Sequence, residues 1–342
     1  MNNMMRVSKM VSSESSKKKV KEIMRTSTIT LTFGDAGENH NGMEMLGTLG
    51  EVGSGFSMDE LRQMEERMSG EGFECTLHDL GLHHRSGFEP AGLLVVKQFA
   101  DLPESEALFE ELVSFEWDRK FWCRRRKRVL NKHARSNVMI LDGRSQEPCY
   151  EEGKGRVVEG DTLPVFAGLK ARMVENLNRA SGSDKASGMI CEGNRYFDLK
   201  KCGIGYHGDT ERRKVVAVRV GAPLSLHYTW FHKHLPVGGT FEFTIENGDL
   251  YVMSEKAVGY DWKRSSIYTL RHAAGASKYT SLAKYAAAVK GRDHGGSSDA
   301  GEGVVGGKRK RLQRVMRDGG SDAGGSEGKR AKKETDDATP SR

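Results

Sequence analysis

A histidine and an aspartate two residues apart, His207 and Asp209, have the spacing in this 342-residue chain that is most typical of metal chemistry. On a β-strand or at its end, side chains two positions apart point to one face, so the imidazole and the carboxylate could share a metal ion. Two histidines and one carboxylate form the facial triad of non-haem iron(II) enzymes, which leaves coordination positions open. The pair therefore predicts an Fe(II) site that needs one further ligand.

The residues around this pair make the prediction more specific. From Asn194 to Glu211 the chain reads Asn-Arg-Tyr-Phe-Asp-Leu-Lys-Lys-Cys-Gly-Ile-Gly-Tyr-His-Gly-Asp-Thr-Glu. This run resembles the AlkB family of 2-oxoglutarate-dependent dioxygenases, in which an Asn-x-Tyr strand leads through a glycine-containing turn into Ile-Gly-x-His-x-Asp and an acidic residue. The resemblance covers roughly residues 91 to 283.

The resemblance implies Fe(II), 2-oxoglutarate as cosubstrate and dioxygen, with Asn194 and Tyr196 as hydrogen-bonding partners of 2-oxoglutarate. An amide and a phenol are both suitable donors to a carboxylate. The implied reaction converts 2-oxoglutarate into succinate and CO2, forms an iron(IV)-oxo species and demethylates alkylated nucleic acid, releasing formaldehyde; the target base would be flipped into the pocket. Two alternatives stay open: the same chemistry on a protein or small molecule, and a catalytically silent module that binds nucleic acid.

The third iron ligand is less clear from the sequence. Residues 248–254, Gly-Asp-Leu-Tyr-Val-Met-Ser, resemble the strand that precedes the second ligating histidine of the family. The family usually places that histidine soon afterwards, where residues 259–263 read Gly-Tyr-Asp-Trp-Lys. We therefore expect an insertion that delays the ligand to His272, with Asp261 as the alternative.

The basic residue that would pair with the far carboxylate of 2-oxoglutarate depends on that choice. If His272 is the ligand, Arg271 points to the opposite face of the strand, and Lys278 becomes the candidate. If Asp261 is the ligand, Arg271 lies at the spacing found in the family. Lys278 is the first choice and Arg271 the second.

The expected fold is mainly β with flanking helices (α+β), around a double-stranded β-helix, or jelly-roll, core. Helices are predicted at residues 58–68, from Pro103 onward and at 165–179, where apolar residues recur at helical spacing. Short apolar segments bounded by Gly, Pro or Asn predict strands at residues 91–99, 195–197, 214–220, 224–231, 241–245, 250–253 and 266–273. Several such strands in succession favour a sandwich or jelly roll that encloses a narrow pocket.

Composition divides the chain into three parts. Residues 1–70 are rich in Met, Gly, Ser and Glu and are expected to form a disordered or weakly structured extension. Residues 71–290 would form the dioxygenase domain. Residues 291–342 are expected to be a disordered basic tail, whose clusters at 308–311 and 329–333 favour nuclear over cytoplasmic localisation.

The charge distribution suggests a polyanionic partner. Lys and Arg number 54 against 47 Asp and Glu, which gives a formal net charge of +7, and much of the excess is clustered. Five consecutive basic residues at 124–128 lie beside Trp122, a combination that suits DNA or RNA. The five cysteines include no Cys-x-x-Cys pair, and no run of 18 apolar residues predicts a membrane span.

Overall fold

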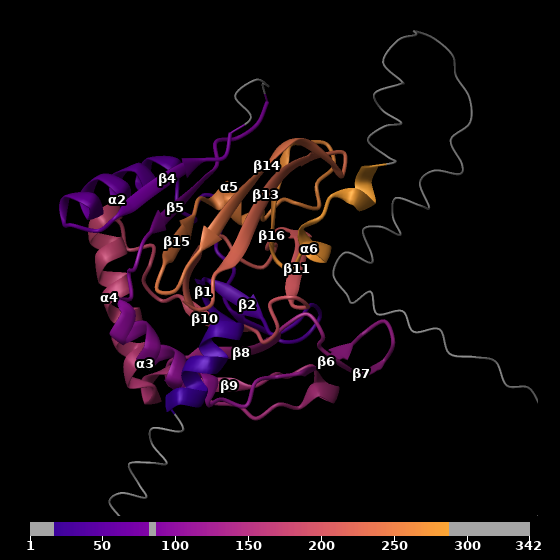
Figure 1. Cartoon of the computed structure of the whole chain (residues 1–342). Helices are drawn as coiled ribbons and strands as arrows, with labels where there is room; N and C mark the ends of the chain where they lie inside the picture. Colours follow the sequence, from indigo (N-terminus) through magenta and orange to yellow (C-terminus); the bar gives the residue numbers. More distant parts are fainter. Residues whose placement is uncertain (1–16, 82–86, 287–342) are drawn as a thin grey trace, which may run out of the picture.

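Two β-sheets face each other in the computed structural model, which describes residues 17–81 and 87–286 (Figure 1). The larger sheet has eight strands in the order β4-β5-β15-β12-β1-β10-β8-β9, and the smaller has four in the order β11-β16-β13-β14. Neighbours are antiparallel except β8 and β9, which are parallel. The protein is therefore mainly β, as the sequence predicted.

The larger sheet consists of β1 (Thr28–Gly34), β4 (Cys75–Asp79), β5 (Gly92–Val96), β8 (Ser136–Leu141), β9 (Val157–Glu159), β10 (Ile190–Tyr196), β12 (Val215–Gly221) and β15 (Leu250–Met253). The smaller sheet consists of β11 (Gly203–His207), β13 (Leu224–His232), β14 (Leu235–Ile245) and β16 (Thr269–Gly275). Two separate hairpins are formed by β2 (Ala36–Glu38) with β3 (Met45–Gly47), and by β6 (Lys120–Cys123) with β7 (Arg128–Asn131).

Besides a helix at residues 17–26, which packs on the same apolar cluster, three helices cover the face of the larger sheet that points away from the smaller one (Figure 1). They are α2 (Met58–Gly70), α3 (Leu102–Val113) and α4 (Pro164–Ser181), while α5 (Glu255–Val258) and α6 (Ser277–Thr280) are single turns. Ser57 and Glu60 form a reciprocal capping box at the start of α2, and Asp101 caps α3. The predicted helices and strands from residue 91 to 275 are thus confirmed, with shifts of a few residues at their ends.

The N-terminal strand β1 corrects the expectation that residues 1–70 form a weakly structured extension. It pairs along its length with β10 on one side and β12 on the other, so it lies inside the larger sheet. Ile29, Leu31 and Phe33 point toward the helices and are fully buried. The alternation Thr-Ile-Thr-Leu-Thr-Phe at residues 28–33 is a strand signal that the compositional argument overlooked.

The folded domain therefore begins well before the predicted boundary at residue 71. Helix α2 adds buried Leu61, Met64 and Met68 to the same apolar layer. The predicted C-terminal tail, residues 291–342, lies outside the described residues. Within the described ranges, no helix is both long and apolar enough to cross a membrane.

Candidate metal centre

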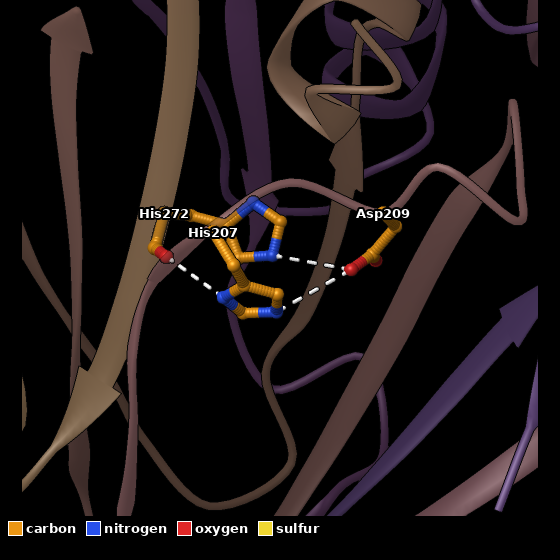
Figure 2. A group of neighbouring side chains, drawn as sticks. All are labelled: His207, Asp209 and His272. Atoms are coloured by element: carbon orange, nitrogen blue, oxygen red, sulfur yellow. Dashed lines mark hydrogen bonds and ion pairs between the residues drawn. The ribbon is translucent and has the colours of Figure 1, made fainter. Parts of the chain in front are cut away.

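Two histidines and an aspartate converge between the two sheets. His207 is the last residue of β11, and His272 is its direct cross-strand partner on β16. Asp209 follows two residues later, and its Oδ1 lies 3.4 Å from His207 Nε2 and 3.8 Å from His272 Nε2. Figure 2 shows both imidazoles and the carboxylate pointing toward one another. One potential ligand atom from each residue lies within 4.8 Å of the others, so the group could hold a metal ion.

Asp261, the alternative third ligand, is engaged elsewhere. Its carboxylate Oδ2 lies 2.7 Å from Lys256 Nζ, and both side chains are buried. This ion pair ties the segment that follows α5 back to that helix. The structure thus groups His272, not Asp261, with His207 and Asp209.

The hydrogen bonds of His207 engage its Nδ1 and leave its Nε2 free to bind a metal ion. Its Nδ1 lies 2.8 Å from the carbonyl oxygen of Gly205 and 3.1 Å from that of His272, so Nδ1–H can donate to backbone oxygens. That tautomer leaves a lone pair on Nε2, which faces Asp209. Burial, reinforced by the nearby His207, lowers the pKa of His272 to about 4, so this imidazole is neutral at physiological pH.

The buried guanidinium of Arg212 lies beside Asp209 and stabilises its negative charge. Arg212 Nη2 lies 2.8 Å from Glu192 Oε2, and its Nε lies 3.8 Å from Asp209 Oδ2. Burial alone would raise the pKa of Asp209, but the contact with His207 and the charge of Arg212 hold that pKa below its usual range. Burial and the negative charge of Asp209 raise the pKa of Glu211 to about 7. Asp209 is therefore kept ionised, as a metal ligand must be.

Gly208 allows the turn between the two ligands to pack against the segment after α5. A Cβ atom at this position would overlap the carbonyl oxygen of Gly259, and Asp209 N–H donates to Val258 O at 3.0 Å. The two backbones therefore approach more closely than any side chain would permit.

Gly208→Ala is expected to displace this turn, lower the free energy of unfolding by about 1–3 kcal/mol and weaken metal binding. Gly205→Ala is the matched control, because a Cβ there would make only an ordinary 3.7 Å contact with Tyr279 O. Urea denaturation and metal titration of both variants test this. Equal metal affinities would contradict the assigned role of Gly208.

The two residues expected to bind 2-oxoglutarate lie on the face of β10 that points into the inter-sheet space. Asn194 Oδ1 accepts hydrogen bonds from Arg135 Nε, at 2.6 Å, and from Asn137 Nδ2. Tyr196 is buried in the apolar cluster that joins the two sheets. Both residues thus face the same space as the metal group, with an adjacent cation at Arg135.

The two candidate basic residues lie elsewhere. Arg271 alternates with His272 along β16 and stacks over Phe231 and Trp262, at 4.1 and 5.1 Å from the ring centroids. It therefore points to the opposite face of the smaller sheet, as expected if His272 is the ligand. Lys278 is exposed on α6, where its ammonium lies 4.9 Å from the centroid of the Tyr279 ring. The structure brings neither residue into the inter-sheet space.

Several further polar residues lie in that space and were not predicted from the sequence. Arg219 on β12, Thr30 on β1, Tyr228 on β13 and Tyr251 on β15 are all buried between the sheets. The signal for Arg219 was available: an arginine interrupts Val-Val-Ala-Val-Arg-Val, an apolar run typical of a strand buried on both faces.

Charged side chains gather beside the metal group. Lys263 Nζ lies 3.3 Å from the hydroxyl of Thr210, which follows Asp209 directly. Glu38, at the end of β2, is close enough to Lys263 and Arg124 for both cations to influence its carboxyl, whose pKa is raised chiefly by burial. Arg124 begins the β6–β7 turn and packs against Gly42. The charges of this basic turn and of Lys263 therefore both reach Glu38.

His40 offers a pH test of the segment after β2. Its ring stacks on Phe121, with centroids 3.6 Å apart, and burial and the charges of Lys132 and Arg135 lower its pKa to about 3. An unfolded histidine titrates near about pH 6.5, so the unfolded chain binds more protons between the two values. The stability conferred by neutral His40 is present above about pH 6.5 and is lost as the pH falls toward 3.

Relative to His40→Phe, the wild-type free energy of unfolding should therefore drop by up to about 3 kcal/mol between pH 6.5 and 4. Phenylalanine keeps a ring against Phe121 but does not titrate. Urea denaturation at a series of pH values measures the difference, and carboxylate titration affects both proteins alike. Parallel stability profiles would contradict the low pKa of His40.

The fold and the site together define a mainly β protein, with helices on one side of a large sheet and a buried His-Asp-His group between two sheets that could hold a metal ion. No family model matches the chain. Uncharacterized protein R156 of Acanthamoeba polyphaga mimivirus is 40% identical over 257 residues, which cover 74% of this chain and 97% of the viral protein. The chain belongs to the same protein family as R156.

Proposed function

We propose that this protein is an Fe(II)- and 2-oxoglutarate-dependent dioxygenase of AlkB-like type. The observation that carries the proposal is the convergence of His207, Asp209 and His272, two imidazoles and one carboxylate, with their ligand atoms within 4.8 Å of one another. This donor set is the one typical of non-haem Fe(II) oxygenases. The backbone hydrogen bonds of His207 and the guanidinium of Arg212 provide the outer support that such ligands require.

The strand order supports a jelly-roll core. From β10 to β16 the chain crosses repeatedly between the larger and the smaller sheet, with β13 and β14 adjacent in the smaller one. A jelly roll has eight such strands in two sheets. In this chain β1 would be the eighth strand, because it lies between β10 and β12 in the larger sheet.

Each residue of the site would have a distinct task. His207, Asp209 and His272 would hold the iron, and Asn194 and Tyr196 would orient 2-oxoglutarate beside it. Bound iron would activate dioxygen and couple the conversion of 2-oxoglutarate to succinate and CO2 with oxidation of a substrate C–H bond. The apolar cluster between the sheets would exclude water from that reaction.

The proposed substrate is alkylated nucleic acid, DNA or RNA, whose demethylation would release formaldehyde. The β6–β7 turn supports this choice, because five exposed cations, Arg124 to Arg128, follow the half-buried Trp122. Clustered cations neutralise phosphates and an aromatic ring can stack on a base. A protein or small-molecule substrate is the alternative outcome, and nuclear localisation remains a prediction.

Succinate formation from 2-oxoglutarate, measured with Fe(II) in the presence and absence of methylated oligonucleotides, tests the proposal. We expect turnover that rises with the methylated oligonucleotide and yields formaldehyde. Turnover that is the same with and without the methylated oligonucleotide would disprove nucleic acid as the substrate. It would favour the same chemistry on a protein or small molecule. No turnover, together with retained oligonucleotide binding, would favour a catalytically silent module.

A further inference from the structure

A single arginine is buried between the sheets without a carboxylate partner. Arg219 is 1% exposed, and within residues 17–81 and 87–286 no carboxylate lies within ion-pairing distance of its guanidinium. Its Nε donates to the hydroxyl of Thr30 at 3.3 Å, its Nη1 donates to Leu224 O, and a third contact reaches the phenol of Tyr251. A guanidinium has five N–H groups, so these three contacts to neutral groups do not use all of its donors.

Burying a charged group whose hydrogen-bond partners are all neutral is unfavourable for the free energy of folding. Burial lowers the pKa of Arg219, although the guanidinium remains protonated at physiological pH. Removing a cation from water is strongly unfavourable unless an anion or a strong hydrogen-bond network compensates it. Two other buried cations near the site have such anions, since Arg212 pairs with Glu192 and Lys256 with Asp261. Arg219 is thus suited to a ligand that brings its own negative charge.

The strand register places Arg219 in line with the proposed 2-oxoglutarate residues. Thr30 pairs with Asn194 on one side and with Arg219 on the other, so these three side chains form a row across β10, β1 and β12. Tyr196 lies two residues beyond Asn194 on the same face of β10, close enough for the charge of Arg219 to influence its phenol. Because β1 is the central strand of this row, the site depends on the N-terminal segment.

Two tyrosines connect Arg219 to the metal group. Tyr251 hydrogen-bonds to Arg219, and its phenol is also influenced by the charge of Asp209. Tyr228 is the cross-strand partner of His272, and their ring centroids lie 5.9 Å apart. The hydroxyl of Tyr228 is buried and has no hydrogen-bond partner among the described residues. An unpaired hydroxyl and a cation without an anionic partner among the described residues thus lie between the sheets, on the same side as the metal ligands.

We infer that Arg219 binds the far carboxylate of a linear 2-oxo dicarboxylate whose other end lies at the metal group, with Tyr228 and Tyr251 as flanking hydroxyls. The inference rests on the proposed function. It places the cation that pairs with the far carboxylate on β12, instead of at Lys278 or Arg271. A guanidinium can engage a carboxylate through two N–H groups, which fixes the position of a bound anion. The site would therefore select dicarboxylates over 2-oxo acids that end in a methyl group.

Binding measured by calorimetry without oxygen, in the presence of Fe(II), separates charge recognition from turnover. The ligands are 2-oxoglutarate and 2-oxohexanoate, which has a similar length but no second carboxylate. Wild-type protein should prefer 2-oxoglutarate strongly. Arg219→Gln should lose about 100-fold or more of its affinity for 2-oxoglutarate while its affinity for 2-oxohexanoate changes little.

Two further variants keep the test valid if Arg219→Gln fails to fold. Arg219→Lys retains the charge but cannot form the two-pronged contact, so it should keep part of the preference. Arg271→Gln removes a buried arginine from the opposite face of the smaller sheet, and it should leave the ligand preference unchanged. A folded Arg219→Gln or Arg219→Lys protein with the wild-type preference would overturn the inference. If wild-type protein binds neither 2-oxo acid with Fe(II), the proposed function fails first, and this inference fails with it.

Discussion

Replacing His272 with alanine is expected to weaken metal binding by more than about 100-fold and to remove any Fe(II)-dependent turnover. Changing residues that merely support a ligand commonly costs about 10- to 100-fold in affinity, so losing one of three ligands should cost more. His272 Nε2 lies 3.8 Å from Asp209 Oδ1, and the ring is held in the neutral form that a metal requires. Equilibrium dialysis with Fe(II) without oxygen measures the loss.

Asp261→Asn is the matched control for His272→Ala. Asp261 was the alternative ligand, and the two side chains come from the same part of the chain. Asparagine there should leave Fe(II) affinity close to the wild-type value, although it leaves Lys256 without its buried anion and could cost about 3–5 kcal/mol of stability. Both variants should therefore be compared at a temperature where circular dichroism shows them folded. Full iron affinity in His272→Ala, or its loss in a folded Asp261→Asn protein, would disprove the assigned ligand set.

The metal group could be predicted from sequence to the extent that its residues are close in the chain. His207 and Asp209 are two residues apart, so strand geometry alone places them on one face. His272 is far away in sequence, and only the pairing of β16 with β11 decides that it meets His207. The choice between His272 and Asp261 was therefore open until the register was known.

The sequence marks Arg219 as an unusual residue in an apolar strand, but its position between the sheets could not be predicted for a similar reason. The sequence placed it in a predicted strand, but a strand that stands alone does not reveal which face meets the second sheet. Its neighbours Thr30 and Tyr251 come from an earlier and a later strand of the chain and meet it only through the order β15-β12-β1. Lys278 was favoured because it follows His272 in sequence, and Arg271 because it follows Asp261 at the spacing found in the family, whereas the larger sheet supplies a buried arginine from an earlier strand.

The N-terminal strand carries the second large effect. A chain that begins at residue 71 lacks β1 and is expected not to fold, because β10 and β12 would lose the partner that joins them. The row of Asn194, Thr30 and Arg219 would be broken as well. Domains of this kind are stable by only about 5–15 kcal/mol, far less than the loss of a central strand would cost. Circular dichroism and thermal denaturation should show no cooperative transition, whereas a chain that begins at residue 17 should unfold like the full protein.

A point substitution separates the contribution of β1 packing from that of chain length. Leu31 is fully buried in the middle of β1, between Gly193 of β10 and Val218 of β12. Leu31→Ala should lower the free energy of unfolding by about 2–5 kcal/mol, through lost apolar contact and the cavity left behind. Leu49→Ala, in the same N-terminal segment but 45% exposed, should change it by less than about 0.5 kcal/mol. Equal effects of the two substitutions in urea denaturation would mean that β1 does not lie in the core. Thr30 could then not lie between Asn194 and Arg219 in the proposed site.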